Sequence, residues 1–121
     1  REDTKISFMA MPDAIKAILM LVDVPREYLT RQVYNITAFS LTAGEFRKRA
    51  DNAFPGTRIV FEPNPRRQGI VDSWPEDMDD SAARKDWGWQ PDYDIVRFFD
   101  DYFLPEIRKR YAVRPSLRTQ E

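Results

Sequence analysis

The chain has 121 residues, 42% of them apolar and 13% aromatic, which is enough for one small domain with a modest core and argues against intrinsic disorder. Charged residues make up 32% of the sequence but nearly cancel to a net charge of −1, a balance that does not favour nucleic acid or an anionic membrane as a partner. Cysteine and histidine are both absent, which excludes a disulfide framework, a thiolate zinc site and the Ser-His-Asp and Cys-His catalytic groups.

The N-terminal part of the sequence predicts a strand and then an apolar helix. Ile6 and Phe8 alternate with polar neighbours over residues 4–10, as in a half-buried strand. Pro12 suits the first turn of the helix that follows, and Pro25 ends it. Apolar residues cover most of this helix, namely Ala14, Ile15, Ala17, Ile18, Leu19, Leu21 and Val22. We therefore expect it to be buried on most sides.

A second strand and a second helix are predicted next. Residues 32–36 contain the β-formers of a short strand. Thr42 and Glu45 have the spacing of a capping box, which marks the start of a helix. The Pro-Gly pair at positions 55–56 stops that helix.

The middle of the chain predicts a third strand and a long irregular arm. Residues 57–62 alternate, with Ile59 and Phe61 on one face. From 63 to 78 the sequence has no helical period, and prolines recur, so we expect a loop with at most a short edge strand at 70–73. Loops of this length are commonly functional or held against a partner surface.

Two helices are predicted in the last third. One of the aspartates at 79–80 caps a short helix, which ends at Gly88 in a left-handed conformation. Asp94 caps the last helix, which Pro105 kinks or restarts. We assign residues 1–111 to the folded domain and residues 112–121 to a polar tail.

The segment from Arg66 to Pro75 combines the chemistry of a pocket wall. Arg67 offers a planar donor fork to a carboxylate or phosphate, Gln68 adds an amide, and Trp74 adds a flat apolar surface with one donor. These residues predict the binding of a small anionic or polar ligand. Two alternatives remain open: the arginines could be a solvated basic pair, and the tryptophan could be a core residue under the arm.

Neither a metal site nor a set of catalytic residues is indicated. The acidic turn lacks the spacing and glycine of an EF-hand, and carboxylates are common at helix starts in any case. It comprises Glu76, Asp77, Asp79 and Asp80. None of the five tyrosines has a lysine four residues later, so the Tyr-x-x-x-Lys pair of short-chain dehydrogenases is missing. The arm is therefore expected to hold a substrate for chemistry supplied elsewhere.

Residues 80–91 combine an Asp-Ser start, a predicted helix and then Gly-Trp-x-Pro. This stretch resembles the closing signature of the extended short-chain dehydrogenases/reductases, also known as the NAD-dependent epimerase/dehydratase superfamily. The helix start at 11–15 and the strand and helix start at 34–45 match as well. Together with Arg-Gln-x-Ile-x-Asp-Ser-Trp-Pro at 67–75, this pattern resembles the L-threonine 3-dehydrogenases of the short-chain type.

A comparison with UDP-galactose 4-epimerases, which resemble the chain less, bears on the substrate. Those enzymes carry Arg-x-Gly-Asp where this chain has Arg67, Gly69 and then Ile70. The missing carboxylate argues against a nucleotide sugar. Trp74 would also narrow the pocket, which suits a small amino acid.

The resemblance implies both a fold and a function. The fold is a small α/β C-terminal substrate-binding domain with short strands and about four helices, without its Rossmann domain. The full-length enzyme would bind NAD on that N-terminal domain and oxidise L-threonine to 2-amino-3-oxobutyrate. Arg67, Gln68 and Trp74 would contact or support the substrate. The catalytic tyrosine and lysine and the cofactor site would lie in the missing part, so this fragment alone should be inactive.

The resemblance also implies partners and a location, and it leaves two alternatives. We expect the domain to pack on its own Rossmann domain, in a homodimer when full length, in the cytoplasm, with no bound metal, nucleic acid or membrane. The first alternative is the same domain of a nucleotide-sugar epimerase or dehydratase. The second is a free-standing interaction module. We also expect the isolated fragment to self-associate, since it would expose apolar surface that its partner domain normally covers.

Overall fold

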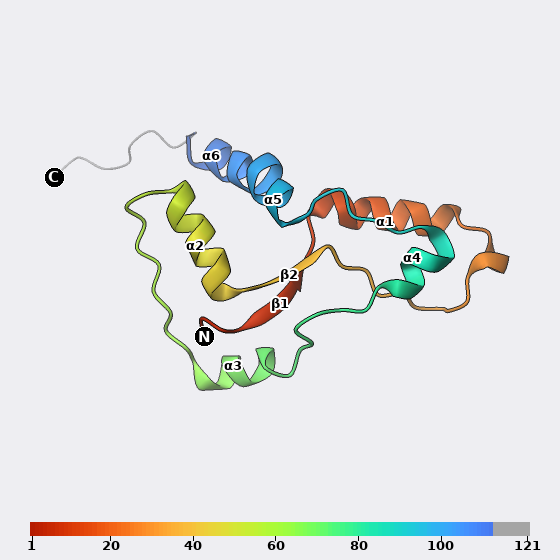
Figure 1. The fold of residues 1–121 in the computed structure, drawn as a ribbon, viewed down its shortest axis with the longest axis horizontal. Helices are drawn as coiled ribbons and strands as arrows, with labels where there is room; N and C mark the ends of the chain where they lie inside the picture. Colours follow the sequence, from red (N-terminus) through yellow and green to blue (C-terminus); the bar gives the residue numbers. More distant parts are fainter. Residues whose placement is uncertain (113–121) are drawn as a thin grey trace.

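A computed structural model describes residues 1–112 and confirms the predicted α/β class with short strands. Helices surround one small sheet (Figure 1). In chain order the elements are β1 (Lys5–Phe8), α1 (Met11–Asp23), the 3₁₀ turn η1 (Arg26–Tyr28), β2 (Phe39–Thr42), α2 (Ala43–Ala53), α3 (Pro65–Val71), α4 (Ser81–Trp87), α5 (Ile95–Arg97), the π-helix η2 (Phe98–Phe103) and α6 (Leu104–Ala112).

The sheet pairs the first predicted strand with a segment that was not predicted as a strand. β1 and β2 run antiparallel, with Lys5 opposite Thr42 and Phe8 opposite Phe39. The strand predicted over residues 32–36 is wrong, because β2 begins only at Phe39. A strand requires a hydrogen-bonded neighbour, and within residues 1–112 no other strand pairs with 32–36.

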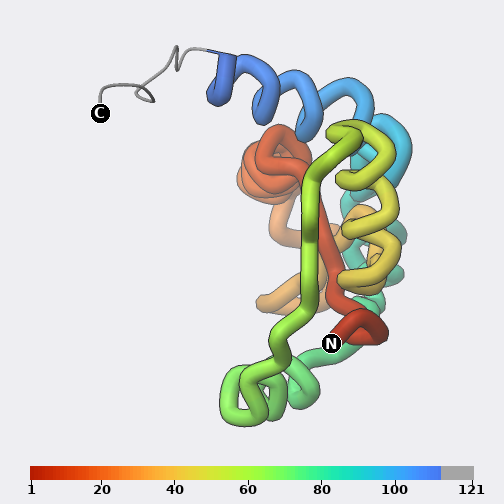
Figure 2. Tube along the Cα trace, turned by 90° about the vertical axis from the view of Figure 1, so that its left-hand side faces the viewer, coloured from red at the N-terminus to blue at the C-terminus, as the bar shows by residue number. Residues whose placement is uncertain are grey.

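The third predicted strand, residues 57–62, is also wrong, although the predicted alternation of buried and exposed side chains is present. Residues 57–62 form no ladder with the described sheet. Ile59 and Phe61 are half-buried, whereas Arg58, Val60 and Glu62 between and beside them are exposed. The segment runs extended between α2 and α3 in Figure 2, so the pattern describes which side faces the protein but provides no partner strand.

The predicted capping box of α2 is confirmed. The Thr42 hydroxyl accepts a hydrogen bond from the Glu45 backbone N–H at 3.1 Å, and the Glu45 carboxylate accepts one from the Thr42 backbone N–H at 2.7 Å. The pKa of the Glu45 carboxyl is lowered by hydrogen bonds that it accepts from the Thr42 backbone N–H and the Thr42 hydroxyl. The helix ends at Ala53, just before the predicted Pro-Gly stop at 55–56, where Gly56 has φ = 89°.

Two predicted caps in the last third are confirmed, at Gly88 and Asp94, whereas Asp80 occupies the N-cap position of α4 without a side-chain capping hydrogen bond. α4 ends at Gly88 with φ = 69°, and the Trp89 N–H reaches the Ala83 carbonyl, as in a Schellman motif. The Asp94 side chain accepts hydrogen bonds from two backbone N–H groups at the start of α5. The helix changes geometry near Pro105, where η2 gives way to α6 at Leu104. The predicted tail, 112–121, lies outside the described residues apart from Ala112, which ends α6.

The core of the described residues consists of two clusters rich in aromatic side chains. The first centres on Phe98 and Phe99 and includes residues from β2, α2, η2 and α6. Its members are Ala10, Phe39, Phe46, Tyr93, Ile95, Phe98, Phe99, Tyr102, Phe103 and Leu104. The second cluster centres on the fully buried Trp89 and joins α1 to α4. Its members are Met9, Ala17, Met20, Tyr34, Ile36, Ala83, Trp87 and Trp89.

The expectation that α1 is buried on most sides is wrong. Its inner face is narrow, with Asp13 and Ala17 buried, while its large apolar side chains point outward. The exposed residues are Met11, Ile15, Ile18, Leu19 and Val22. Within residues 1–112, too little of the protein packs against the outer side of α1 to bury it. None of the helices within residues 1–112 is long and apolar enough to cross a membrane.

Candidate functional site

Most of the Arg66–Pro75 segment, which was predicted as a pocket wall in an irregular arm, belongs to the helix α3. Asn64 caps α3 by accepting a hydrogen bond from the Arg67 N–H at 3.1 Å, and Pro65 occupies the first helical position. The expected irregular arm and the edge strand at 70–73 are therefore wrong for this stretch. The Asn-Pro pair at 64–65 was the sequence signal for a helix start. The helix is only seven residues long, however, and its apolar residues do not recur at helical spacing.

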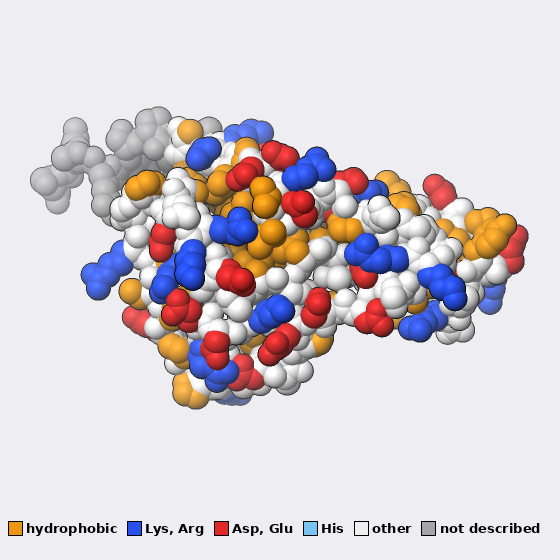
Figure 3. All heavy atoms as spheres, in the orientation of Figure 1, with side chains coloured by type: hydrophobic (Ala, Val, Ile, Leu, Met, Phe, Trp, Pro, Cys, Tyr) orange, Lys and Arg blue, Asp and Glu red, His pale blue; other side chains and the backbone are white. Residues whose placement is uncertain are grey.

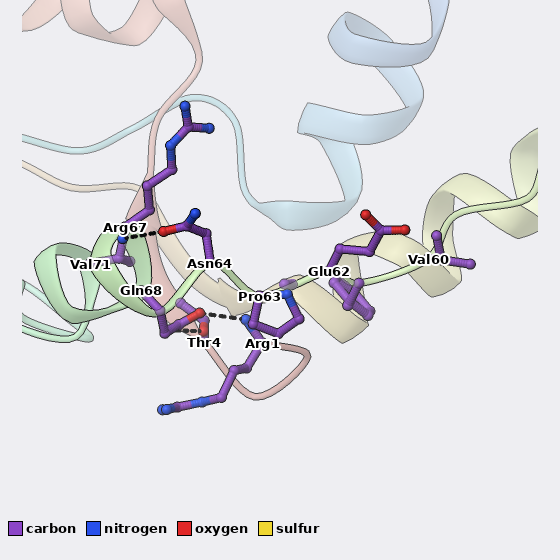
Figure 4. Close-up of a pocket in the computed structure, with 11 residues that line it drawn as sticks. Arg1, Thr4, Val60, Glu62, Pro63, Asn64, Arg67, Gln68 and Val71 are labelled. Carbon is purple, nitrogen blue, oxygen red and sulfur yellow. Dashed lines mark hydrogen bonds between the residues drawn. The ribbon is translucent and has the colours of Figure 1, made fainter.

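A cavity of about 350 Å³ lies between α3, the extended segment before it and the start of β1. Arg67 and Gln68, two of the three predicted site residues, line this cavity (Figure 4). Its remaining lining residues are Arg1, Thr4, Ala43, Val60, Phe61, Glu62, Pro63, Asn64 and Val71. The structure thus brings two predicted residues to one concave surface.

Gln68 supports the cavity wall by linking two distant parts of the chain. Its amide nitrogen donates to the Thr4 hydroxyl at 2.8 Å and to the Asp72 carboxylate at 2.6 Å. Its amide oxygen accepts a hydrogen bond from the Arg1 backbone nitrogen at 2.7 Å. Because these bonds occupy the amide, Gln68 holds α3 against the start of β1 and is not free to take a ligand.

Arg67 has a different position. Its side chain is exposed and extends away from Gln68 in Figure 4. Within residues 1–112 its guanidinium forms no ion pair or hydrogen bond, so its full donor fork faces solvent beside the cavity. Such an arrangement can bind a carboxylate in a bidentate manner.

Trp74 does not line the cavity, and it is not a core residue. Its side chain is 54% exposed, which rules out the alternative of a buried plug under the arm. Arg67 and Ile70 lie three residues apart in α3 and share one side of the helix, and Trp74 follows three residues after the helix ends at Val71. Ile70 is 56% exposed. We call these three exposed side chains, Arg67, Ile70 and Trp74, the α3 face; they combine one guanidinium with an isoleucine and an indole.

The carboxylates of the acidic turn, residues 76–80, accept hydrogen bonds from separate partners. Asp77 accepts from the Ser40 hydroxyl at 2.8 Å, Asp79 accepts from the Ser81 N–H at 2.9 Å, and hydrogen bonding to these serines lowers the pKa of both carboxyls. Asp80 is buried and accepts two hydrogen bonds from the Arg84 guanidinium, at 2.7 and 2.9 Å. Among residues 1–112 no group of acidic side chains converges in the manner of a metal site.

A polar network that the sequence did not indicate connects the loop after α1 to α4. The Asp86 carboxylate accepts hydrogen bonds from the Tyr34 hydroxyl at 2.7 Å, the Thr30 hydroxyl at 2.5 Å and the Thr30 N–H at 3.1 Å. The Tyr34 ring also meets Trp87 edge to face at 6.0 Å. No spacing rule predicts such a cluster, because its members come from positions more than fifty residues apart.

The Asp86 network should make stability fall on acidification. Hydrogen bonds from Thr30 and Tyr34 lower the pKa of Asp86 below the ordinary 3.8. A lowered folded-state pKa contributes stability above the unfolded value, and that stability is lost as the pH falls through the folded pKa. We expect the stability gap between the natural protein and Asp86→Asn to shrink between about pH 5 and pH 2, as followed by urea unfolding. A gap that does not change with pH would contradict this assignment.

Comparison with known proteins finds relatives for most of the chain, although no family model matches it. The mitochondrial L-threonine 3-dehydrogenase of Bos taurus is 39% identical over 95 residues, which span 78% of this chain and 26% of that protein. An uncharacterized epimerase/dehydratase of Staphylococcus haemolyticus is also 39% identical, over 96 residues that span 78% of this chain and 30% of that protein. This chain therefore spans between a quarter and a third of the curated relatives it matches.

Solved structures match over nearly the whole described region. The L-threonine dehydrogenase of Phytophthora infestans superimposes with a TM-score of 0.83 at 36% identity, covering 91% of this chain and 35% of that one. A monomeric L-threonine 3-dehydrogenase from a metagenome superimposes with a TM-score of 0.81 at 34% identity, again covering 91% of this chain and 35% of that one. The arrangement of β1, β2 and the helices is thus that of one part of these enzymes.

Proposed function

Because the chain belongs to the extended short-chain dehydrogenase/reductase superfamily and corresponds to the C-terminal part of its threonine dehydrogenases, we propose that it is the substrate-binding domain of an NAD-dependent L-threonine 3-dehydrogenase. The domain spans residues 1–111 in this proposal. The observation that carries it is the α3 face, which combines exposed apolar side chains with a guanidinium that has no partner within residues 1–112. That combination suits a small amino acid with a carboxylate and a methyl group.

The NAD site of the proposed enzyme does not fit the residues of this chain. Its four glycines stand singly, at positions 44, 56, 69 and 88, so no glycine-rich phosphate loop of the G-x-G-x-x-G type exists. The sequence also lacks a Tyr-x-x-x-Lys pair. We therefore assign cofactor binding and the catalytic residues to the domain that precedes this part in full-length relatives. The 121-residue chain should form no NADH from threonine and NAD.

In the proposed complex each residue of the α3 region has its own role. Arg67 binds the substrate carboxylate, while Trp74 and Ile70 cover its side chain and exclude water during hydride transfer. Gln68 acts indirectly, since its bonds to Thr4 and Asp72 fix the orientation of α3. Closure of this domain over the cofactor domain would bring the α3 face to the reacting atoms.

The main alternative is the corresponding domain of a nucleotide-sugar epimerase or dehydratase, since epimerase/dehydratase relatives match the chain as well. Such an enzyme would need a polar group near Arg67 to hold the nucleotide. Position 70 has an exposed isoleucine instead. Turnover of a UDP-sugar by the full-length enzyme, without threonine oxidation, would establish this alternative and overturn the proposal.

The assembly and the location of the full-length protein are further parts of the proposal. We propose a homodimer whose contacts involve mainly the cofactor domain. A monomeric relative with this same C-terminal fold indicates that the present domain does not need a second copy to fold. The cytoplasmic location remains a prediction, and the bovine relative is named as mitochondrial.

Substitution of Arg67 tests the proposed carboxylate contact. In the full-length enzyme, Arg67→Ala should lower kcat/KM for L-threonine by about 10- to 100-fold, the usual effect of losing a charge-assisted hydrogen bond. Most of the loss should appear as a raised KM, and Arg67→Lys should restore part of it. Arg66→Ala is the matched control, because Arg66 is an exposed neighbour that does not line the cavity. Equal losses for Arg66→Ala and Arg67→Ala would show that the effect is not specific.

A further inference from the structure

A second cavity, larger than the one at α3, lies beside the end of α1. Its volume is about 490 Å³, and it opens between the last turns of α1, the 3₁₀ turn η1 and the loop that follows η1. Figure 1 places η1 and α3 at different ends of the molecule, so this cavity is separate from the one that Arg67 and Gln68 line. We call it the η1 cavity. No residue of the α3 face lines it.

The walls of the η1 cavity contain hydrogen-bond donors that have no partner. Arg26 and Arg31 contribute exposed guanidiniums and Gln32 contributes an amide, and within residues 1–112 none of these side-chain groups forms a hydrogen bond or an ion pair. By contrast, the guanidinium of Arg84 pairs with Asp80 at 2.7 Å. Two unpaired cations at one concave surface favour an anion as the ligand.

The cavity is preformed, because hydrogen bonds fix the backbone on both of its sides. In η1 the Leu29 N–H donates to the Arg26 carbonyl at 3.1 Å. In the loop, the Arg31 N–H donates to the Tyr34 hydroxyl at 3.2 Å, and that hydroxyl in turn donates to Asp86 of α4 at 2.7 Å. Since the backbone that carries both arginines is held in this way, little ordering of the loop has to accompany binding.

No carboxylate lines the η1 cavity among the described residues. Glu27 neighbours the first arginine in η1 but is exposed and does not line the cavity. Hydrogen bonds from Ser81 lower the pKa of Asp79, with a smaller contribution from the charge of Arg31, but no ion pair within residues 1–112 joins Asp79 to Arg31. Figure 3 shows acidic and basic side chains interspersed over one face, with several Lys or Arg side chains at the end that carries η1 and α4. The two guanidiniums are therefore available to an incoming anion.

We propose that the η1 cavity binds a small molecule with two negative charges and an apolar portion. Arg26 and Arg31 bind the charged groups through charge-assisted hydrogen bonds. The apolar portion contacts Leu21 and Leu29, which are half-buried in the wall. A phosphate monoester and a dicarboxylate both have this chemistry, and the cavity has room for either. L-Threonine, with one carboxylate beside an ammonium, does not have it, so this site adds a second ligand to the proposed enzyme.

A titration of the isotope-labelled 121-residue chain, followed by two-dimensional amide NMR spectra, tests this site. Phenyl phosphate and glutarate are the two probes, each added at constant ionic strength, and phenol is the uncharged control. The double variant Arg26→Ala/Arg31→Ala removes both guanidiniums of the cavity. The matched control is Arg58→Ala/Arg66→Ala, because these arginines are also exposed but do not line the cavity. The spectrum of each variant verifies that it is folded before the titration begins.

We expect saturable shifts at residues 26–34 with at least one of the two probes, and the tighter probe distinguishes a phosphate ester from a dicarboxylate. Its dissociation constant should rise at least about tenfold in the cavity variant and change by no more than about twofold in the control variant. The absence of saturable shifts at 26–34 would overturn the proposal, and so would equal weakening in the two variants or phenol binding as tightly as phenyl phosphate. The resonances of 26–34 are followed separately from those of 64–74, so the result is independent of whether Arg67 binds the substrate.

Discussion

Replacing Trp89 by alanine should destabilise the chain by about 3–5 kcal/mol, a large part of the total stability of a domain this small. Trp89 is fully buried and is the central residue of the cluster that joins α1 to α4. Its ring lies 5.9 Å from Trp87, and its indole nitrogen donates to the Thr37 carbonyl at 3.3 Å. The substitution would remove that bond and leave a cavity bounded by Ala17 and Ala83, which are too small to fill it.

Urea unfolding followed by far-UV circular dichroism measures this effect without depending on tryptophan fluorescence. Trp74→Ala is the matched control, because it removes the same side chain from a position that is 54% exposed. We expect the control to change stability by no more than about 0.5 kcal/mol. Trp89→Phe should lie between the two. A control as damaging as Trp89→Ala would mean that Trp74 is packed in solution, and the assignment of the α3 face would then be wrong.

Replacing Asp13 by alanine should cost about 2–4 kcal/mol, because its carboxylate accepts two backbone hydrogen bonds at a fully buried position. Removal would leave the N–H groups of Asp92 and Tyr93 without their acceptor. The connection between the start of α1 and the loop before α5 would be lost with them. Asp13→Asn keeps one acceptor oxygen and should have an intermediate effect.

Asp23→Ala provides the control for this second substitution. Asp23 ends the same helix, is exposed, and lies where a negative charge is unfavourable to the helix dipole. We expect its removal to be neutral or to stabilise the protein by a few tenths of a kcal/mol. Thermal melts of the three variants beside the natural chain give the comparison. Loss of stability in Asp23→Ala equal to that in Asp13→Ala would show that the buried acceptor has no special role.

The features that the sequence predicted correctly are those determined by neighbours along the chain. The capping box at Thr42 and Glu45, the Asp94 cap and the left-handed Gly88 each depend on contacts within about four residues, so spacing alone reveals them. The strand segments at 32–36 and 57–62 could not be assigned in this way. The β-formers of 32–36 and the alternation of 57–62 are present, but whether a strand forms depends on a partner that neither pattern contains.

The candidate site was predictable in its residue types and not in its geometry. Arg67 and Gln68 were chosen for their donors, and both line the cavity. Their unequal roles depend on Thr4, which lies 64 residues from Gln68 in the sequence. The exposure of Trp74 could not be predicted from the sequence either. The helical form of the segment that contains Arg67 was missed because a helix of seven residues is too short to show a helical repeat of apolar residues.

The π-helix η2 has a consequence for insertions and deletions in this part of the chain. The Leu104 N–H bonds to the Phe99 carbonyl, five residues back, so η2 contains more residues per turn than the α-helices beside it. Deleting one residue from an ordinary α-helix rotates everything after it by about 100°. Within η2 the same deletion can instead be absorbed, because the wide turn gives up its extra residue and becomes an ordinary α-turn. Phe103 and Leu104 would then keep their side toward the aromatic cluster. The chain should therefore tolerate the loss of one residue within η2 better than the loss of one residue within α1 or α2.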